Sequence, residues 1–142
     1  MKPYLLDINV LIALAWPNHV HHDAALDWFL KKATHGFRTC PITQIGFVRI
    51  SSNPAFTPEA VSPGEALGLL SRVTQLPGHD FWPDDVPLRD TVAPATALIG
   101  HRQITDVYLL ALANKHGGVL ATLDRGAAVL GRTDDKPVEL IL

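Results

Sequence analysis

Short apolar runs alternate with segments of helical spacing along the whole chain, and this alternation constrains the fold more than any other feature. The strand-like runs are residues 4–8, 37–42, 79–82, 119–123 and 138–142. Strands that alternate with helices in this way form right-handed crossover units around a parallel sheet. The sequence therefore predicts an α/β fold: a three-layer α/β/α sandwich with a central, mainly parallel sheet of four to five strands. Because no linker or repeat divides residues 1–142, we expect one domain.

The intervening segments carry helix start and stop signals. Asn9 is a candidate N-cap for the first helix, and Thr43 and Thr105 are candidates for two later ones. Ser62 and Glu65 have the spacing of a capping box around Pro63. We expect helices over residues 10–16, 22–35, 44–52, 63–75, 88–98, 106–115 and 126–130.

The composition excludes several classes of protein. The chain has 142 residues, 47% of them hydrophobic and 18% charged, and a formal net charge of -2. These values exclude a disordered chain and a protein that holds nucleic acid by bulk positive charge. The single cysteine, Cys40, cannot form an internal disulfide, so we expect it to be a small buried side chain. The apolar runs are too short to cross a bilayer, and we expect a cytoplasmic protein with no membrane contact.

Three aspartates far apart in the sequence should meet at one edge of the sheet. Asp7 ends the first strand, Asp124 follows the fourth strand, and Asp106 opens the helix that leads into that fourth strand. Ligands of parallel sheets bind beyond the carboxyl ends of the strands. Clustered carboxylates repel one another and need a cation, and an all-oxygen ligand set selects Mg²⁺ or Mn²⁺. For any one aspartate alone, complementing a helix dipole is the simpler interpretation.

Three segments resemble the motifs of PIN-domain ribonucleases, and most closely those of the VapC toxins of bacterial toxin–antitoxin pairs. They are residues 5–12, 104–113 and 120–126. The resemblance implies a Mg²⁺-dependent endoribonuclease, with Mn²⁺ as a possible substitute. It also implies an RNA substrate, a cognate antitoxin of the VapB type, and a homodimer or a toxin–antitoxin hetero-oligomer.

The resemblance also assigns residue roles. Asp7 and Asp106 would be the principal metal ligands, and Asp124 a third acid that holds a metal or its water. Asn9 would orient Asp7 or a metal-bound water. Thr122 would support the site with its hydroxyl group.

One position departs from the pattern of the family. PIN nucleases carry a glutamate at the start of the helix after the second strand, and Gln44 stands here instead. An amide oxygen is a weaker Mg²⁺ ligand, which leaves open a single-metal site, a second ion brought with the substrate, or low activity. Candidates to hold flanking phosphates are Arg49, Arg102 and Arg125, each of which could equally be a solvated surface charge.

Two other functions compete with the nuclease. Gln44 is compatible with a PIN-like binding module that has little catalytic activity. A phosphotransfer enzyme of the haloacid-dehalogenase type also places an aspartate after its first strand. That enzyme needs a second aspartate where Asn9 stands, and a lysine that Lys115 supplies poorly. For either nucleic-acid function, Trp16 and Trp82 are candidates for stacking on bases at the surface.

Overall fold

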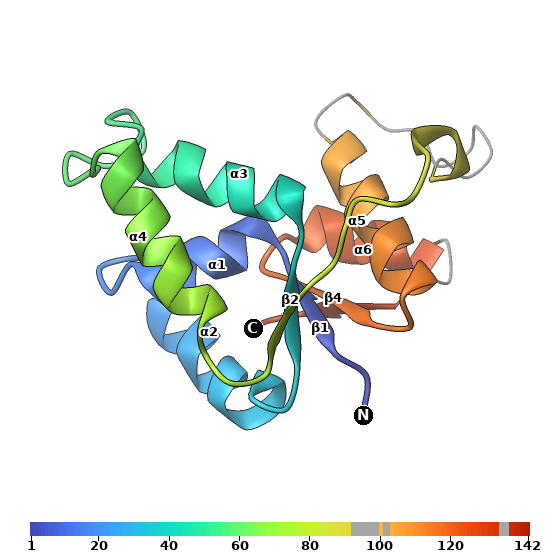
Figure 1. Cartoon of the computed structure of the whole chain (residues 1–142). Helices are drawn as coiled ribbons and strands as arrows, with labels where there is room; N and C mark the ends of the chain where they lie inside the picture. Colours follow the sequence, from blue (N-terminus) through green and yellow to red (C-terminus); the bar gives the residue numbers. More distant parts are fainter. Residues whose placement is uncertain (92–99, 101–102, 134–136) are drawn as a thin grey trace.

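The computed structural model describes residues 1–91, 100, 103–133 and 137–142, which form a parallel sheet between two layers of helices (Figure 1). The strand order in this part of the chain is β3-β2-β1-β4-β5, and every neighbouring pair is parallel. The strands are β1 (Tyr4–Leu6), β2 (Phe37–Thr39), β3 (His79–Phe81), β4 (Val119–Thr122) and β5 (Val138–Leu140). The predicted three-layer sandwich is confirmed.

The helices divide between the two faces of the sheet (Figure 1). One face carries α1 (Ile8–Ala15), α2 (His22–Trp28) with its π-helical extension η1 (Phe29–Ala33), α3 (Pro41–Ser51) and α4 (Pro63–Thr74). The other face carries α5 (Ile104–Lys115) and α6 (Arg125–Thr133). A 3-10 turn, η2 (Leu88–Asp90), is the described part of the helix predicted over residues 88–98, most of which lies outside the described residues.

Three predicted N-caps are wrong, because each helix begins earlier than expected. The cap of α1 is Asp7 rather than Asn9, and the cap of α5 is Gln103 rather than Thr105. In α3 the cap is Cys40, because Pro41 starts the helix. Accordingly β2 ends at Thr39, three residues before the predicted end of that strand at residue 42. The capping box of α4 is present as predicted, with the Glu65 amide donating to Ser62 Oγ at 3.1 Å.

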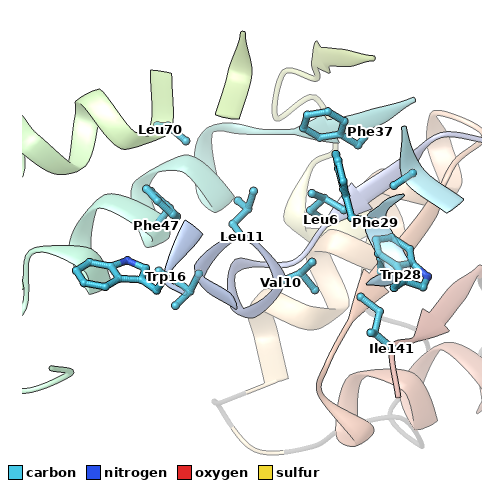
Figure 2. Packing of buried hydrophobic residues seen from close by; sticks show 13 residues of the cluster. Leu6, Val10, Leu11, Trp16, Trp28, Phe29, Phe37, Phe47, Leu70 and Ile141 are labelled. Carbon is cyan, nitrogen blue, oxygen red and sulfur yellow. The ribbon is translucent and has the colours of Figure 1, made fainter. Parts of the chain in front are cut away.

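The core is two apolar clusters, one on each face of the sheet, because successive strand residues point to opposite sides. In β1, Leu6 belongs to the cluster under α1 to α4 and Leu5 to the cluster under α5. Figure 2 shows the first cluster, where Val10 and Leu11 of α1 lie between Phe47 on one side and Phe37 on the other. This packing fixes α1, and therefore Asp7 at its start, against the sheet.

Both tryptophans predicted to stack on bases are buried, so that prediction is wrong. Trp16 is 9% exposed and its Nε1 donates to Ser51 Oγ at 3.1 Å, while Trp82 is 8% exposed and stacks on His116.

Cys40 is fully buried as expected, and burial raises the pKa of its thiol. None of the helices in the described ranges is long and apolar enough to cross a membrane.

Candidate active site

Asp7 lies where β1 ends and α1 begins, and both of its carboxylate oxygens accept hydrogen bonds. Oδ1 accepts from the amide of Ile8 at 2.7 Å, and Oδ2 accepts from the hydroxyl of Thr122 at 2.7 Å. Burial raises the pKa of Asp7, these two hydrogen bonds lower it, and the charge of Asp124 raises it again. A carboxylate oxygen can accept two hydrogen bonds, so each oxygen keeps one lone pair for a cation or water.

Asp106 lies in the first turn of α5 and is half-buried. Burial raises the pKa of Asp106 to about 7, and the charges of Asp7 and Asp124 add to the effect. The charges of these three carboxyl groups, which come from separate segments, therefore interact across the edge of the sheet. With a pKa of about 7, Asp106 is about half protonated at neutral pH, and a bound cation would favour its ionised form.

Asp124 is the exposed member of the cluster and precedes α6. Its Oδ1 accepts from the amide of Gly126 at 2.8 Å, and its own amide donates to Thr122 Oγ1 at 3.0 Å. The convergence expected from the sheet is reflected in the pKa shifts, because the charges of Asp7 and Asp124 act on Asp106 and the charge of Asp124 acts on Asp7.

Thr122 connects the carboxylate of Asp7 to the backbone of Asp124. It is fully buried at the end of β4, donates to Asp7 and accepts from the Asp124 amide. Asn9 lies beside it, with Nδ2 3.5 Å from Thr122 Oγ1, and accepts from the Leu123 amide through Oδ1 at 3.2 Å. Thr122 therefore holds Asp7 directly, whereas the contacts of Asn9 are with Thr122 and Leu123, and the roles predicted for both residues at a metal stay predictions.

Gln44 lies one turn into α3, at the same edge of the sheet. Its Nε2 donates to Thr39 Oγ1 at 3.0 Å, and Thr39 Oγ1 is 2.8 Å from His79 Nε2. Thr39 and His79 were not expected here. The sequence could have singled out Thr39 by its position at the end of β2. Its contact with His79 in β3, however, depends on a strand order that the sequence does not specify.

Of the three candidate arginines, Arg125 lies next to Asp124. It lines a hollow of about 550 Å³ together with Asp124, Leu123 and His21. Arg49 is exposed on α3, and Arg102 lies outside the described residues. Lys115 donates to the backbone of Asp85 at 2.7 Å at the far end of α5, so it is not placed to serve Asp7 as a phosphotransfer enzyme would require.

The residues present fit a loosely held divalent cation. Within the described ranges, no group of three or more His, Cys, Asp or Glu side chains has ready metal-binding geometry. Mg²⁺ does not need such a cage, because it keeps several waters and is often held by one or two carboxylates. Burial raises the pKa of Asp106 most and repulsion from Asp7 and Asp124 adds to it, and a cation would relieve this repulsion.

Comparison with known proteins agrees with this geometry. Residues 4–133 match the family model described as the PIN domain. The chain belongs to the PIN-domain family. Among similar relatives from Mycobacterium tuberculosis, ribonuclease VapC39 is 50% identical over 125 residues, which are 87% of this chain and 90% of the relative. Ribonuclease VapC38 is 44% identical over 138 residues, which are 96% of each chain.

Solved structures share the fold of this chain. VapBC2 from Rickettsia felis, in a complex with a DNA fragment from its promoter, matches with a TM-score of 0.63 and 12% identity over 98% of each chain. FitAcB from Neisseria gonorrhoeae matches with a TM-score of 0.63 and 21% identity over 95% of each chain. At these identities the likeness concerns the fold of this PIN domain alone.

Proposed function

We propose that this PIN domain is the RNA-cleaving toxin of a toxin–antitoxin pair and that its endoribonuclease activity requires Mg²⁺, for which Mn²⁺ can substitute. The observation that carries the proposal is the mutual effect of Asp7, Asp106 and Asp124, three carboxylates from separate segments at one edge of the sheet. Relatives named as VapC ribonucleases at 44–50% identity support the assignment of RNA as the substrate.

Asp7 and Asp106 would hold the metal, and Asp124 would hold it or its water. When bound, Mg²⁺ supplies a Lewis acid that polarises the scissile phosphate and lowers the pKa of a water molecule. Thr122 and Asn9 keep Asp7 oriented, through the hydroxyl bond to its Oδ2 and the contact between the two supporting side chains. A fixed carboxylate loses little entropy when it binds.

Arg125 is the candidate to hold a phosphate of the RNA next to the scissile one. It is exposed, directly follows Asp124, and lines the same hollow of about 550 Å³. The guanidinium group pairs with phosphate through two parallel hydrogen bonds, which positions the strand as well as attracting it. The walls supplied by Leu123 and Ile141 offer apolar surface to a base.

The proposed partner is an antitoxin of the VapB type. Structural neighbours of this chain are described as the VapBC2 complex and as FitAB bound to a DNA fragment. We propose a similar hetero-oligomer here, in which the chain acts as one domain over residues 1–142 and works in the cytoplasm, where its RNA substrate is found. A homodimer of the toxin is part of this proposal.

A growth experiment tests the proposal in cells. Expression of the chain without its antitoxin should arrest growth and produce new RNA 5′ ends, whereas Asp106→Asn should relieve both effects. Asp27→Asn is the matched control, because Asp27 is an exposed helical aspartate whose ion pair, within the described part of the chain, is with Lys31. Arrest that persists in Asp106→Asn would contradict the proposal. If wild-type expression produced no new RNA ends, the result would favour the binding module suggested by Gln44.

A further inference from the structure

The hollow beside Asp124 has the size and position of a binding site. Its volume is about 550 Å³, within the range of about 300–1,000 Å³ that small-molecule sites occupy. It lies between the start of α2, the segment from β4 to α6, and the end of β5, because His21, Asp124 and Leu140 all line it. Asp124 also belongs to the carboxylate cluster, since its charge acts on Asp7 and Asp106. The hollow is therefore continuous with the candidate active site.

Two polar side chains in the hollow have no hydrogen-bonding or ionic partner among the described residues. Arg125 is exposed and forms no ion pair in this part of the chain. The imidazole of His21 lies beside that of His19, with ring centroids 5.7 Å apart, while the His21 amide donates to His19 Nδ1 at 3.0 Å. A guanidinium group pairs with phosphate, and an imidazole offers a flat face and hydrogen-bonding nitrogens to a base.

Apolar side chains and an open strand edge complete the lining of the hollow. Leu123 and Ile141 supply the apolar surface. The Ile141 amide donates to the Thr122 carbonyl at 2.8 Å, so the backbone groups of the preceding residue, Leu140, face away from β4. Within the described residues, no backbone hydrogen bond to Leu140 on that side is present. The free edge of β5 thus offers a main-chain donor and acceptor beside an apolar surface.

We propose that this hollow is a base-selective subsite for the RNA nucleotide next to the scissile phosphate. The base lies against Leu123 and Ile141, and Arg125 holds the phosphate. His21 and the backbone of Leu140 determine which base is accepted, because they supply the hydrogen-bonding groups around the apolar surface. The inference rests on the proposed RNA-cleaving function. An apolar peptide added to the edge of β5 would leave the guanidinium group unpaired, so the lining favours a nucleotide.

Titration with single nucleotides tests the hollow without measuring cleavage. The full chain, freed of antitoxin and metal, is titrated with each of the four ribonucleoside 5′-monophosphates and with ribose 5-phosphate, and the amide chemical shifts are followed by NMR. We expect the preferred nucleotide to bind roughly fivefold more tightly than ribose 5-phosphate, because a base that stacks on protein side chains adds binding free energy. The largest shifts should be those of the amides of residues 123–125 and 140.

Two variants of exposed residues separate base selection from phosphate binding. His21→Ala should reduce the preference among the four bases to less than about twofold and leave the affinity for ribose 5-phosphate unchanged. Arg125→Ala should weaken the binding of nucleotides and of ribose 5-phosphate by the same factor, about threefold to tenfold. His35→Ala is the matched control, because His35 is an exposed histidine that contacts the Lys2 carbonyl and does not line the hollow.

Equal affinity for all nucleotides and ribose 5-phosphate, or a base preference that His21→Ala leaves intact, would overturn the inference. So would shifts of the Leu140 amide that an acetylated valine-rich tetrapeptide ending in glutamate produces and no nucleotide does, because the hollow would then belong to a protein partner. RNA cleavage in Mg²⁺ without nucleotide binding in the hollow would refute the subsite alone. Selective nucleotide binding by a chain that cleaves no RNA would confirm the base-selective hollow and refute the proposed nuclease.

Discussion

Asp7 combines a structural role with the proposed metal-binding role. Through Oδ1 it caps α1, and through Oδ2 it accepts from Thr122. Only 5% of the residue is exposed, so an ionised carboxylate there depends on these two donors for its stability. A buried aspartate whose oxygens still have lone pairs available is a suitable first ligand for a hard cation.

The carboxyl group of Asp106 should make stability depend on pH. Its folded pKa of about 7 lies above the ordinary value of 3.8, so the folded state binds this proton more tightly than the unfolded state does. This contribution to stability is full below about pH 4 and is lost as the pH rises through 7. Without divalent cations at pH 8, Asp106→Asn should be more stable than wild type by about 1 kcal/mol, or roughly 3 °C in Tm, after allowance for solvent screening.

Thermal melts in EDTA at pH 5 and pH 8 measure this difference. The difference in Tm between Asp106→Asn and wild type should shrink at pH 5, because most wild-type molecules are then protonated at Asp106. Excess Mg²⁺ at pH 8 should raise the Tm of the wild type and not that of the variant. A Tm difference that is the same at both pH values would contradict the proposed cluster of repelling carboxylates.

Thr122→Val should lower both stability and metal affinity. The valine leaves Asp7 Oδ2 and the Asp124 amide without their shared partner, and a buried polar group that loses its partner costs about 1–3 kcal/mol. Thr91→Val is the matched control, because Thr91 is also fully buried and donates at 2.6 Å to Leu88. Urea unfolding should show losses in both variants, whereas Mn²⁺ titration should show a loss in Thr122→Val alone.

At the scale of elements, two helix-interior glycines should respond in opposite ways to alanine. In α3, Gly46 faces Ile8 so closely that a Cβ would lie 2.8 Å from its Cγ1, and in α4 Gly68 is exposed with open space around it. Gly46→Ala should cost about 1–3 kcal/mol by forcing α1 and α3 apart. Gly68→Ala should gain roughly 0.5–1 kcal/mol from helix propensity.

Urea unfolding of both glycine variants measures these changes. Because Ile8 adjoins Asp7, Gly46→Ala should also weaken Mn²⁺ binding, and Gly68→Ala should leave it unchanged. Equal stability of the two variants would mean that α1 and α3 are not in the close contact that positions Asp7.

Element types were largely predictable from sequence, and element starts were less so. The capping box at Ser62 was predicted because both of its bonds are local. The start of α1 was misplaced, because Asp7 caps the helix while also bonding to Thr122, which is 115 residues away. The sequence could place Asp7 at a strand end, but it could not show that its side chain performs both tasks.

At the scale of the whole molecule, the sheet determines which polar residues meet. The alternation of strands and helices was enough to predict that Asp7, Asp106 and Asp124 share an edge, because all carboxyl ends of a parallel sheet lie together. The order β3-β2-β1-β4-β5 was not predictable from it. The contact of His79 with Thr39 depends on that order and was therefore missed.

The charge of the whole molecule is also consistent with the proposed site. The net charge of -2 comes from 12 basic and 14 acidic residues, and once the three candidate carboxylates are set aside, 12 basic residues face 11 acidic ones. Bulk charge therefore gives RNA little attraction to this surface, and a metal ion at the acidic edge would supply the local positive charge.

Cleavage of a structured RNA by the purified chain, freed of antitoxin, tests the central claim most directly. Wild type and the control Asp27→Asn should cleave in Mg²⁺, should stop in EDTA, and should recover when Mg²⁺ is restored. Asp7→Asn retains an N-cap for α1 and should fold, yet its cleavage rate should fall at least about 100-fold because a metal ligand is lost. Cleavage that survives EDTA, cleavage by Asp7→Asn at the wild-type rate, or no Mg²⁺-dependent cleavage by the wild type would contradict the account.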